Sequence, residues 1–414
     1  MTGAWAYLLL AAWGALGTSV AFSRGRRPPR LGPLYFILAF PVAEVPLHHL
    51  ALSALVTAGF LARGALATWQ GWAGLLLVAS CWPLLLVMHH RSRQAQRAID
   101  RGLQEGLGEH FFDAIRPELA APLSSGAPLA SWINPFRLHD RARVIRVRDI
   151  TYGPAGRRNR LDLYRPRKRV TGCPVLLQLH GGAWVFGRKD NQGLPLMNEM
   201  ARQGWVCVAP NYRLSPKATF PEHLIDCKLA IRWIRENVAE YGGDPAFIAV
   251  TGGSAGGHLA SLVALTANEP RYQPGFEDVD TSVEAAVPFY GAYDFLEHNG
   301  TRLDRMDHPT FLEKVVMKSS PRDEPRDWER ASPIRQVHAG APPFFALHGS
   351  HDSLVWPEGG RRFAAALRRV SRQAVVYAEL PGAHHAFDIV QSIRCVNSVQ
   401  AVATFLAWVR STRH

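Results

Sequence analysis

A serine on a glycine-rich turn is the residue whose setting in this chain points most directly to chemistry. The frame consists of Gly252, Ser254 and Gly256; the apolar run 246–250 precedes it, and apolar residues at helical spacing follow over 259–265. A sharp strand-to-helix turn strains the serine backbone, requires small neighbours, and presents the hydroxyl at a helix N-terminus. This pattern is typical of an acyl-transfer nucleophile. A glycine-rich turn with an incidental serine, or a phosphate loop, is the alternative interpretation.

A serine nucleophile needs a base that takes its proton and an acid that orients this base, because the hydroxyl is barely nucleophilic at neutral pH. After an elbow of this kind the expected order is serine, acid and histidine, with each residue following a strand. Asp352 follows the strand-like run 344–347, and His385 follows the run 374–380. We therefore predict Ser254, Asp352 and His385 as the catalytic triad.

One alternative exists for the base and one for the acid. His384 lies beside His385 in the same loop and is the alternative base. Asp294 follows the strand-like run 285–290 and is the alternative acid, although we expect a structural role for it.

The oxyanion of an acyl-transfer intermediate is usually bound by backbone N–H groups. His180 ends the nearly continuous apolar run 174–180, and the bare backbone of Gly181 and Gly182 follows it. We expect these two glycines and the amide of Ala255 to form the oxyanion hole, with His180 orienting the loop. This chemistry requires no metal and no cofactor.

The segments that must position these residues alternate between strand and helix over 143–414. Two alternating runs, 144–147 and 159–164, predict edge strands or a hairpin. The predicted strands and helices after them are 174–180, 191–203, 205–209, 221–238, 246–250, 285–290, 343–347, 358–371, 374–377 and 391–411. This order predicts the α/β class, with a doubly wound, mostly parallel sheet and ligands at the carboxyl ends of its strands. Residues 295–335 are polar and irregular.

The first ninety residues are strongly apolar and are predicted to form a membrane region with three transmembrane helices, over 4–22, 31–62 and 65–88. No Lys or Arg precedes the first run, which argues against a cleavable signal peptide. The second run is expected to kink. Its Glu44, His48 and His49 are expected to face a neighbouring helix or to lie near the interface, and a functional polar site is the alternative. Arginines in the loop 24–30 and after Met88 place both basic segments in the cytoplasm by the positive-inside rule. A multi-pass membrane protein with a cytoplasmic catalytic domain follows, and the orientation reverses if one span is re-entrant.

Composition limits the remaining classes of function. The 414 residues carry a net charge of +13, and much of it lies between Arg91 and Arg169, a position suited to anionic head groups. No basic motif interleaved with aromatic residues supports nucleic-acid binding. The five cysteines lack C-x-x-C spacing, so they predict neither a disulfide framework nor a zinc site. We predict three parts: a membrane region over 1–90, a polar helical connector over 91–142, and the catalytic domain over 143–414.

Over residues 144–412 the chain resembles the hormone-sensitive-lipase-like branch of the α/β-hydrolase esterases, and within it the membrane-associated carboxylesterases of the mycobacterial Lip type. The matching motifs occupy residues 180–184, 211–216, 252–257, 349–352 and 382–387. The family pattern G-x-x-H-x-F aligns with Gly382, His385 and Phe387. The resemblance thus implies His385 rather than His384 as the base, Ser254 as the nucleophile and Asp352 as the acid. It also implies Gly181, Gly182 and Ala255 as the oxyanion donors.

Two positions depart from the common family pattern. Many members carry an acidic residue directly before the nucleophile, where this chain has Gly253, and the strand-end motif begins with Asn211 rather than Asp. Neither departure affects the triad. We expect a serine carboxylesterase or lipase that acts on small-molecule or lipid esters and contacts membrane lipids. An amidase such as an arylformamidase, and a membrane-lipid acyltransferase with the same triad, are the alternatives.

Overall fold

The structure is a computed structural model in which the described residues are 2–23, 31–119, 134–136, 138–168, 170–296 and 311–413. The predicted basic loop 24–30, residues 120–133 of the predicted connector and residues 297–310 of the irregular segment therefore lie outside the described residues.

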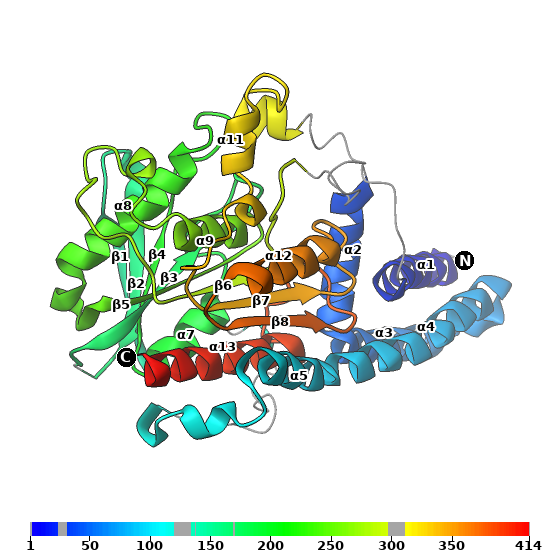
Figure 1. Cartoon of the computed structure of the whole chain (residues 1–414). Coiled ribbons are helices and arrows are strands. Elements are labelled where there is room, and N and C mark those ends of the chain that lie inside the picture. The colour runs from blue at the N-terminus through cyan, green and yellow to red at the C-terminus, as the bar shows by residue number, and fades with distance from the viewer. Residues whose placement is uncertain are drawn as a thin grey trace.

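An eight-stranded sheet forms the centre of the larger part of the molecule, with the strand order β1-β2-β4-β3-β5-β6-β7-β8 (Figure 1). Its strands are β1 (Val144–Thr151), β2 (Arg160–Pro166), β3 (Cys173–Leu179), β4 (Val206–Pro210), β5 (Gly243–Gly253), β6 (Ala285–Phe289), β7 (Phe344–Gly349) and β8 (Val375–Leu380). The first two strands pair antiparallel, β2 is antiparallel to β4, and all the remaining pairs are parallel. The predicted α/β-hydrolase fold with a mostly parallel sheet is confirmed.

Helices cover both faces of this sheet because its central strands are apolar on both sides. Val175 and Leu177 of β3 pack with α8 (Glu222–Asn237), α9 (Ala255–Leu265) and α12 (Pro357–Val370) on one face. Leu176 points to the other face, against α7 (Leu194–Arg202) and α13 (Ile393–Thr412). The order of the strands reverses at β3, with β4 on one side and β5 on the other. Ligands of such sheets bind at this switch point.

Helix α5 (Ala95–Leu107) belongs to the covering layer of the sheet, although the sequence predicts residues 91–142 as a connector. Its residues Ala95, Ile99 and Leu103 recur every four positions and are buried in the same cluster as β8 and α13. Figure 1 shows α5 beneath β8 and beside α13. An amphipathic helix with one apolar stripe packs in this way. The packing of the hydrolase part therefore extends N-terminal to residue 143.

The smaller elements connect the main ones. They are η3 (Phe111–Ala114), η4 (Pro117–Leu119), η5 (Gly156–Asn159), η6 (Val238–Tyr241), η7 (Pro270–Tyr272), η9 (Leu312–Met317), α11 (Pro325–Arg330) and η10 (Pro333–Arg335).

The N-terminal region consists of α1 (Thr2–Phe22), α2 (Gly32–Glu44), α3 (Pro46–Leu61), η2 (Ala65–Ala67) and α4 (Trp69–Arg93). Two helices in the described residues, one over Gly3–Phe22 and one starting at Trp69, are long and apolar enough to cross a membrane. The predicted single kinked helix over 31–62 is instead two helices, α2 and α3, bent by 88°. Pro46 cannot donate a backbone hydrogen bond, which explains the break at this point.

Helices α1, α3 and α4 pack together and project from the hydrolase (Figure 1). Trp5 lies 5.6 Å from Trp69 between ring centroids, and Arg91 lies 4.6 Å above the ring of Phe22, so α1 and α4 run in the same direction. Both helices end at the hydrolase. Large apolar side chains along the projecting part are exposed, among them Trp5, Leu9, Trp13, Leu55, Trp69 and Leu76.

Candidate active site

Ser254 occupies the turn between β5 and α9, at the switch point of the sheet. Its φ of 58° and ψ of −121° fall outside the regions that non-glycine residues ordinarily adopt. The Ser254 N–H donates a hydrogen bond of 3.0 Å to the Phe289 carbonyl, which ties the turn to β6. A Cβ at Gly256 would lie 2.1 Å from the Leu179 carbonyl oxygen, so a side chain there would push α9 away from β3. The local geometry is that of a nucleophile elbow.

Asp352 and His385 come together from the loops after β7 and β8. His385 Nδ1 donates to Asp352 Oδ2 at 2.7 Å, and the carboxylate is fully buried. The other oxygen, Oδ1, accepts hydrogen bonds of 2.8 Å from the backbone N–H groups of Leu354 and Val355. His348 Nε2 lies 3.4 Å from Oδ2. The carboxylate is therefore oriented by its own loop and directed at the imidazole of His385.

The charge state of Asp352 follows from these neighbours. Burial alone would raise its pKa, but His385 and His348 outweigh burial and hold the pKa well below the ordinary value of 3.8. An ionised Asp352 keeps the His385 proton on Nδ1 and leaves Nε2 as the proton acceptor.

The alternative base and the alternative acid occupy other positions. His384 Nε2 donates a hydrogen bond of 3.0 Å to the Ala21 carbonyl of α1, so this side chain is directed at the N-terminal helices. Asp294 Oδ1 accepts the N–H of Leu296 at 3.1 Å in the turn after β6. Of the two adjacent histidines, His385 is the one paired with Asp352.

The predicted oxyanion loop lies against the elbow. An ideal Cβ on Gly181 would be 3.1 Å from Ser254 Cβ. The Gly181 N–H, however, donates to Gln192 Oε1 at 2.6 Å and therefore already has an acceptor. Sequence reasoning missed Gln192 because nothing in a glutamine eleven residues downstream signals this contact. Of the three predicted donors, Gly182 and Ala255 remain.

His180 holds the backbone of this loop. Its ring stacks on Tyr212 with 4.2 Å between centroids, and Tyr212 Oη donates to the His180 carbonyl at 2.7 Å. His180 Nδ1 lies 2.8 Å from the Gly181 carbonyl, to which it donates. Burial lowers the His180 pKa to about 4, so the ring is neutral at neutral pH. A neutral His180 ring that stacks on Tyr212 and donates to the Gly181 carbonyl suits the predicted role of orienting this loop.

A second buried histidine connects the oxyanion loop to the elbow helix. Trp184 Nε1 donates to His258 Nδ1 at 3.2 Å, and His258 Nε2 donates to the Ala331 carbonyl at 2.7 Å. The His258 ring also stacks on Phe295 with 4.6 Å between centroids. Burial lowers the His258 pKa to about 4, which fits the neutral ring that this donor and acceptor pattern requires.

Tyr290, which sequence reasoning missed, lies between the elbow and His385. Its ring centroid is 4.5 Å from that of His385, and its hydroxyl donates to Asp388. A Cβ at Gly253 would lie 2.6 Å from Tyr290 Oη. The phenol thus occupies the space beside position 253, where many members of the resembled family carry an acidic side chain. In the sequence, Gly253 marked a departure from the family pattern, but it did not identify Tyr290 as the side chain that fills the space.

A cavity of about 270 Å³ lies beside the acid loop, between the N-terminal helices and the hydrolase. Val20 of α1 and Tyr35 and Ala39 of α2 line one side, and Asp352 and Trp356 line the other. The ends of the N-terminal helices therefore border the catalytic region itself.

Comparisons with known proteins agree with this geometry. The BD-FAE family profile matches residues 161–367. The probable carboxylic ester hydrolase LipM of Mycobacterium tuberculosis is 47% identical over 80% of this chain and 76% of its own length. The esterase LipQ of the same organism is 49% identical over 78% of this chain and 76% of its own length. The solved structure of Thermogutta terrifontis esterase 2 phosphonylated by sarin has a TM-score of 0.52 at 25% identity, covering 62% of this chain and 91% of that one.

Proposed function

The chain belongs to the hormone-sensitive-lipase-like α/β-hydrolases and, within them, to the Lip-type carboxylic ester hydrolases, and we propose that Ser254, His385 and Asp352 perform its ester hydrolysis. The protein is a serine carboxylesterase. What is proposed is the assignment of roles to residues. The observation that carries it is the 2.7 Å hydrogen bond from His385 Nδ1 to a buried Asp352 that its own loop orients.

Acylation begins when Ser254 Oγ attacks the ester carbonyl carbon and His385 Nε2 takes the hydroxyl proton. The carboxylate of Asp352 stabilises the imidazolium that forms. The N–H groups of Gly182 and Ala255 bind the oxyanion of the tetrahedral intermediate, and α9 adds the positive end of its dipole. The intermediate then collapses, the bond to the alcohol oxygen breaks, and the alcohol leaves with the proton from His385.

Deacylation repeats these steps with water. His385 takes a proton from the water molecule, the hydroxide attacks the acyl carbon, and the second tetrahedral intermediate collapses to release the acid. The proton returns to Ser254 Oγ. Each step is a proton transfer or an acyl transfer between named atoms, and none requires a cofactor.

The test of this assignment is the Ser254→Ala variant. The rate of p-nitrophenyl butyrate hydrolysis should fall at least about 1,000-fold, because the nucleophile is lost while the oxyanion donors remain. Ser320→Ala, which makes the same chemical change in the turn before α11, should keep the wild-type rate. A Ser254→Ala variant that folds and hydrolyses the ester at a near-wild-type rate contradicts the assignment.

We also propose that α1, α3 and α4 anchor the enzyme in a membrane, with the hydrolase on the cytoplasmic side. The exposed apolar side chains of the projecting bundle support this, as do Arg91 and Arg93 at the hydrolase end of α4. Lipid esters as substrates and membrane lipids as partners follow from this placement. Extraction with alkaline carbonate should leave the protein in the membrane pellet, and protease added outside intact spheroplasts should spare the hydrolase. Release into the supernatant, or cleavage of the hydrolase, contradicts the proposal.

A further inference from the structure

The loop that carries His385, residues 381–387, is packed against the N-terminal helices. Two contacts reach it from residues that precede it by more than 300 positions in the chain: the Ala21 carbonyl and the Phe36 ring. A third N-terminal group, the Glu44 carboxylate, binds Ser392 and Arg394, which follow the loop. Figure 1 shows α2 standing beside the carboxyl ends of β7 and β8, where this loop begins. The role of Glu44 in this packing rests on the proposed role of His385 as the base.

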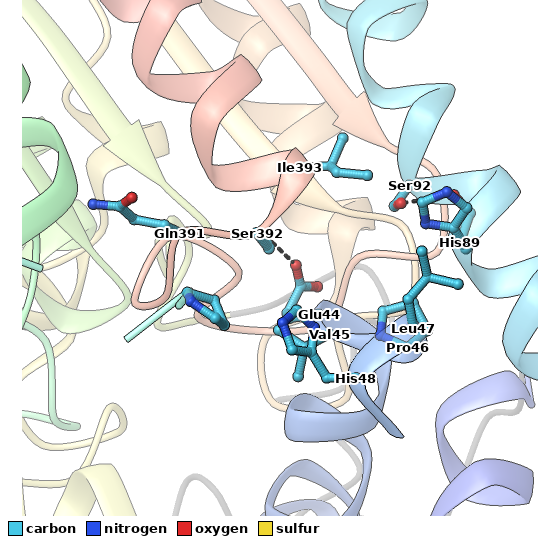
Figure 2. Close-up of a pocket in the computed structure, with 11 residues that line it drawn as sticks. Glu44, Val45, Pro46, Leu47, His48, His89, Ser92, Gln391, Ser392 and Ile393 are labelled. Atoms are coloured by element: carbon cyan, nitrogen blue, oxygen red, sulfur yellow. Dashed lines mark hydrogen bonds between the residues drawn. The ribbon is translucent and has the colours of Figure 1, made fainter. Parts of the chain in front are cut away.

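Glu44 forms a buried ion pair with Arg394 at the start of α13. Glu44 Oε1 lies 3.1 Å from Arg394 Nη1, and the exposed fractions of the two side chains are 0% and 1%. Glu44 Oε2 accepts the hydroxyl hydrogen bond of Ser392 at 2.8 Å, as Figure 2 shows. Arg394 Nη1 also donates to the Ala43 carbonyl at 2.9 Å. Both carboxylate oxygens of Glu44 are therefore bound by residues of the hydrolase.

The same two hydrolase residues hold the two ends of the His385 loop. Arg394 Nε and Nη2 donate to the Pro381 carbonyl at 3.2 and 3.0 Å, where the loop begins. Ser392 Oγ lies 3.5 Å from the Phe387 carbonyl, where the loop ends, and accepts the N–H of Cys395 as the cap of α13. Glu44 thus orients one residue at each end of the loop.

The middle of the loop is also held by the N-terminal helices. His384 Nε2 donates to the Ala21 carbonyl at 3.0 Å, and the Phe36 ring meets the His385 ring edge-on, with 6.0 Å between centroids. The His385 imidazole must keep its bond to Asp352 while its other nitrogen faces Ser254. A displacement of about 1 Å of a reacting group can cost about 100-fold in rate. A loop fixed at both ends and in its middle avoids such a displacement.

We propose that the N-terminal helical region is part of the catalytic centre and that Glu44 is a positioning residue for His385, acting through Arg394 and Ser392. A carboxylate inside an apolar segment is costly to bury, and an apolar side chain would suffice to join two surfaces. A carboxylate, however, can bind a guanidinium and a hydroxyl at once in a defined geometry. Activity therefore depends on the docking of the N-terminal helices against the hydrolase.

The experiment uses the full-length chain in detergent micelles, with p-nitrophenyl butyrate as substrate. Glu44→Gln should lower kcat about 10- to 100-fold and leave KM within about twofold, because binding groups remain while the base is displaced. Arg394→Lys should lower kcat similarly, since a single ammonium cannot bridge the Glu44 carboxylate and the Pro381 carbonyl as the guanidinium does. Glu105→Gln makes the same change as Glu44→Gln at an exposed position of α5 and should keep the wild-type kcat.

A double variant separates positioning from simple stability. Glu44→Leu with Arg394→Leu removes both buried charges, so it should unfold at a higher temperature than Glu44→Leu alone. Its kcat should stay low, because the Pro381 carbonyl has lost its donor. Recovery of kcat together with thermal stability overturns the proposal, as does a Glu44→Gln variant with wild-type kcat. Ser254→Ala is measured in the same series to distinguish the two proposals. Activity in that variant contradicts the proposed triad, whatever the result for the Glu44 variants.

Discussion

The two halves of the catalytic centre are held in place by different means. The elbow that carries Ser254 is formed by residues adjacent to it in the chain: the end of β5, the start of α9 and the glycines between them. The loop that carries His385 is contacted by Ala21 and Phe36, and its ends are held by Arg394 and Ser392, both of which bind Glu44. The proposed nucleophile is therefore a local feature of the hydrolase fold. On our proposal, the position of the base depends on the N-terminal helices, which lie outside the sheet and its covering helices.

This difference is the basis of our proposal that the N-terminal helices support the catalytic centre as well as the proposed attachment to a membrane. Val20 at the end of α1 and Tyr35 and Ala39 of α2 line the cavity beside the acid loop. On this proposal, the alignment of Ser254, Asp352 and His385 depends on the docking of the N-terminal helices against the hydrolase.

The largest effect is expected on the base side, from Asp352→Asn. An asparagine cannot stabilise the imidazolium and presents either an amide or a carbonyl to His385 Nδ1, so the correct tautomer is no longer enforced. The kcat for p-nitrophenyl butyrate should fall about 10,000-fold with little change in KM. Asp294→Asn, at the alternative acid, is the matched control and should change kcat less than tenfold. Equal losses in the two variants would refute the choice of acid.

A smaller effect is expected at the elbow, from Gly253→Ala. The added methyl would lie 2.6 Å from Tyr290 Oη, so either the turn or the phenol must shift. We expect kcat to fall about 10- to 100-fold, as a displaced nucleophile implies.

The double variant Gly253→Ala with Tyr290→Phe removes the atom nearest to the added methyl. Because the two residues share one contact, their effects on kcat should not add. The double variant should therefore lose less activity than the two single losses together predict. Additive losses would show that Tyr290 does not occupy the space beside position 253.

The smallest effect concerns the pH dependence of stability on the elbow side. The pKa of His258 is about 4 in the folded protein and 6.5 ordinarily, so between these values the unfolded chain binds more protons. The free energy of unfolding must then rise with pH in this window, and lowering the pH from 7 to 5 should cost up to about 2 kcal/mol at this site. Urea unfolding at both pH values should show a smaller pH difference for His258→Gln than for the wild type. An unchanged difference would mean that His258 is not buried as a neutral ring.

Much of the fold could be predicted from the sequence because apolar periodicity reports burial. The parallel strands appear as short apolar runs, and the helices between them as runs with helical spacing, so the order of elements follows directly. The boundaries between the membrane region, the connector and the catalytic domain were harder to predict from the sequence. Helix α5 looks polar when only its composition is considered, and its stripe of Ala95, Ile99 and Leu103 finds its partner on β8, far along the chain.

The chemistry divides in the same way. The sequence by itself determined the elbow around Ser254 and predicted the order of nucleophile, acid and base, because backbone sterics and strand order act over a few residues at a time. The sequence pattern favoured His385 over His384, but only the tertiary structure showed its hydrogen bond to Asp352. Only the tertiary structure engaged the Gly181 amide with Gln192 and placed Tyr290 beside Gly253. Only the tertiary structure joined Glu44 to Arg394, across 350 positions. Pairings of this kind are decided by which surfaces pack together, and a linear pattern does not record that.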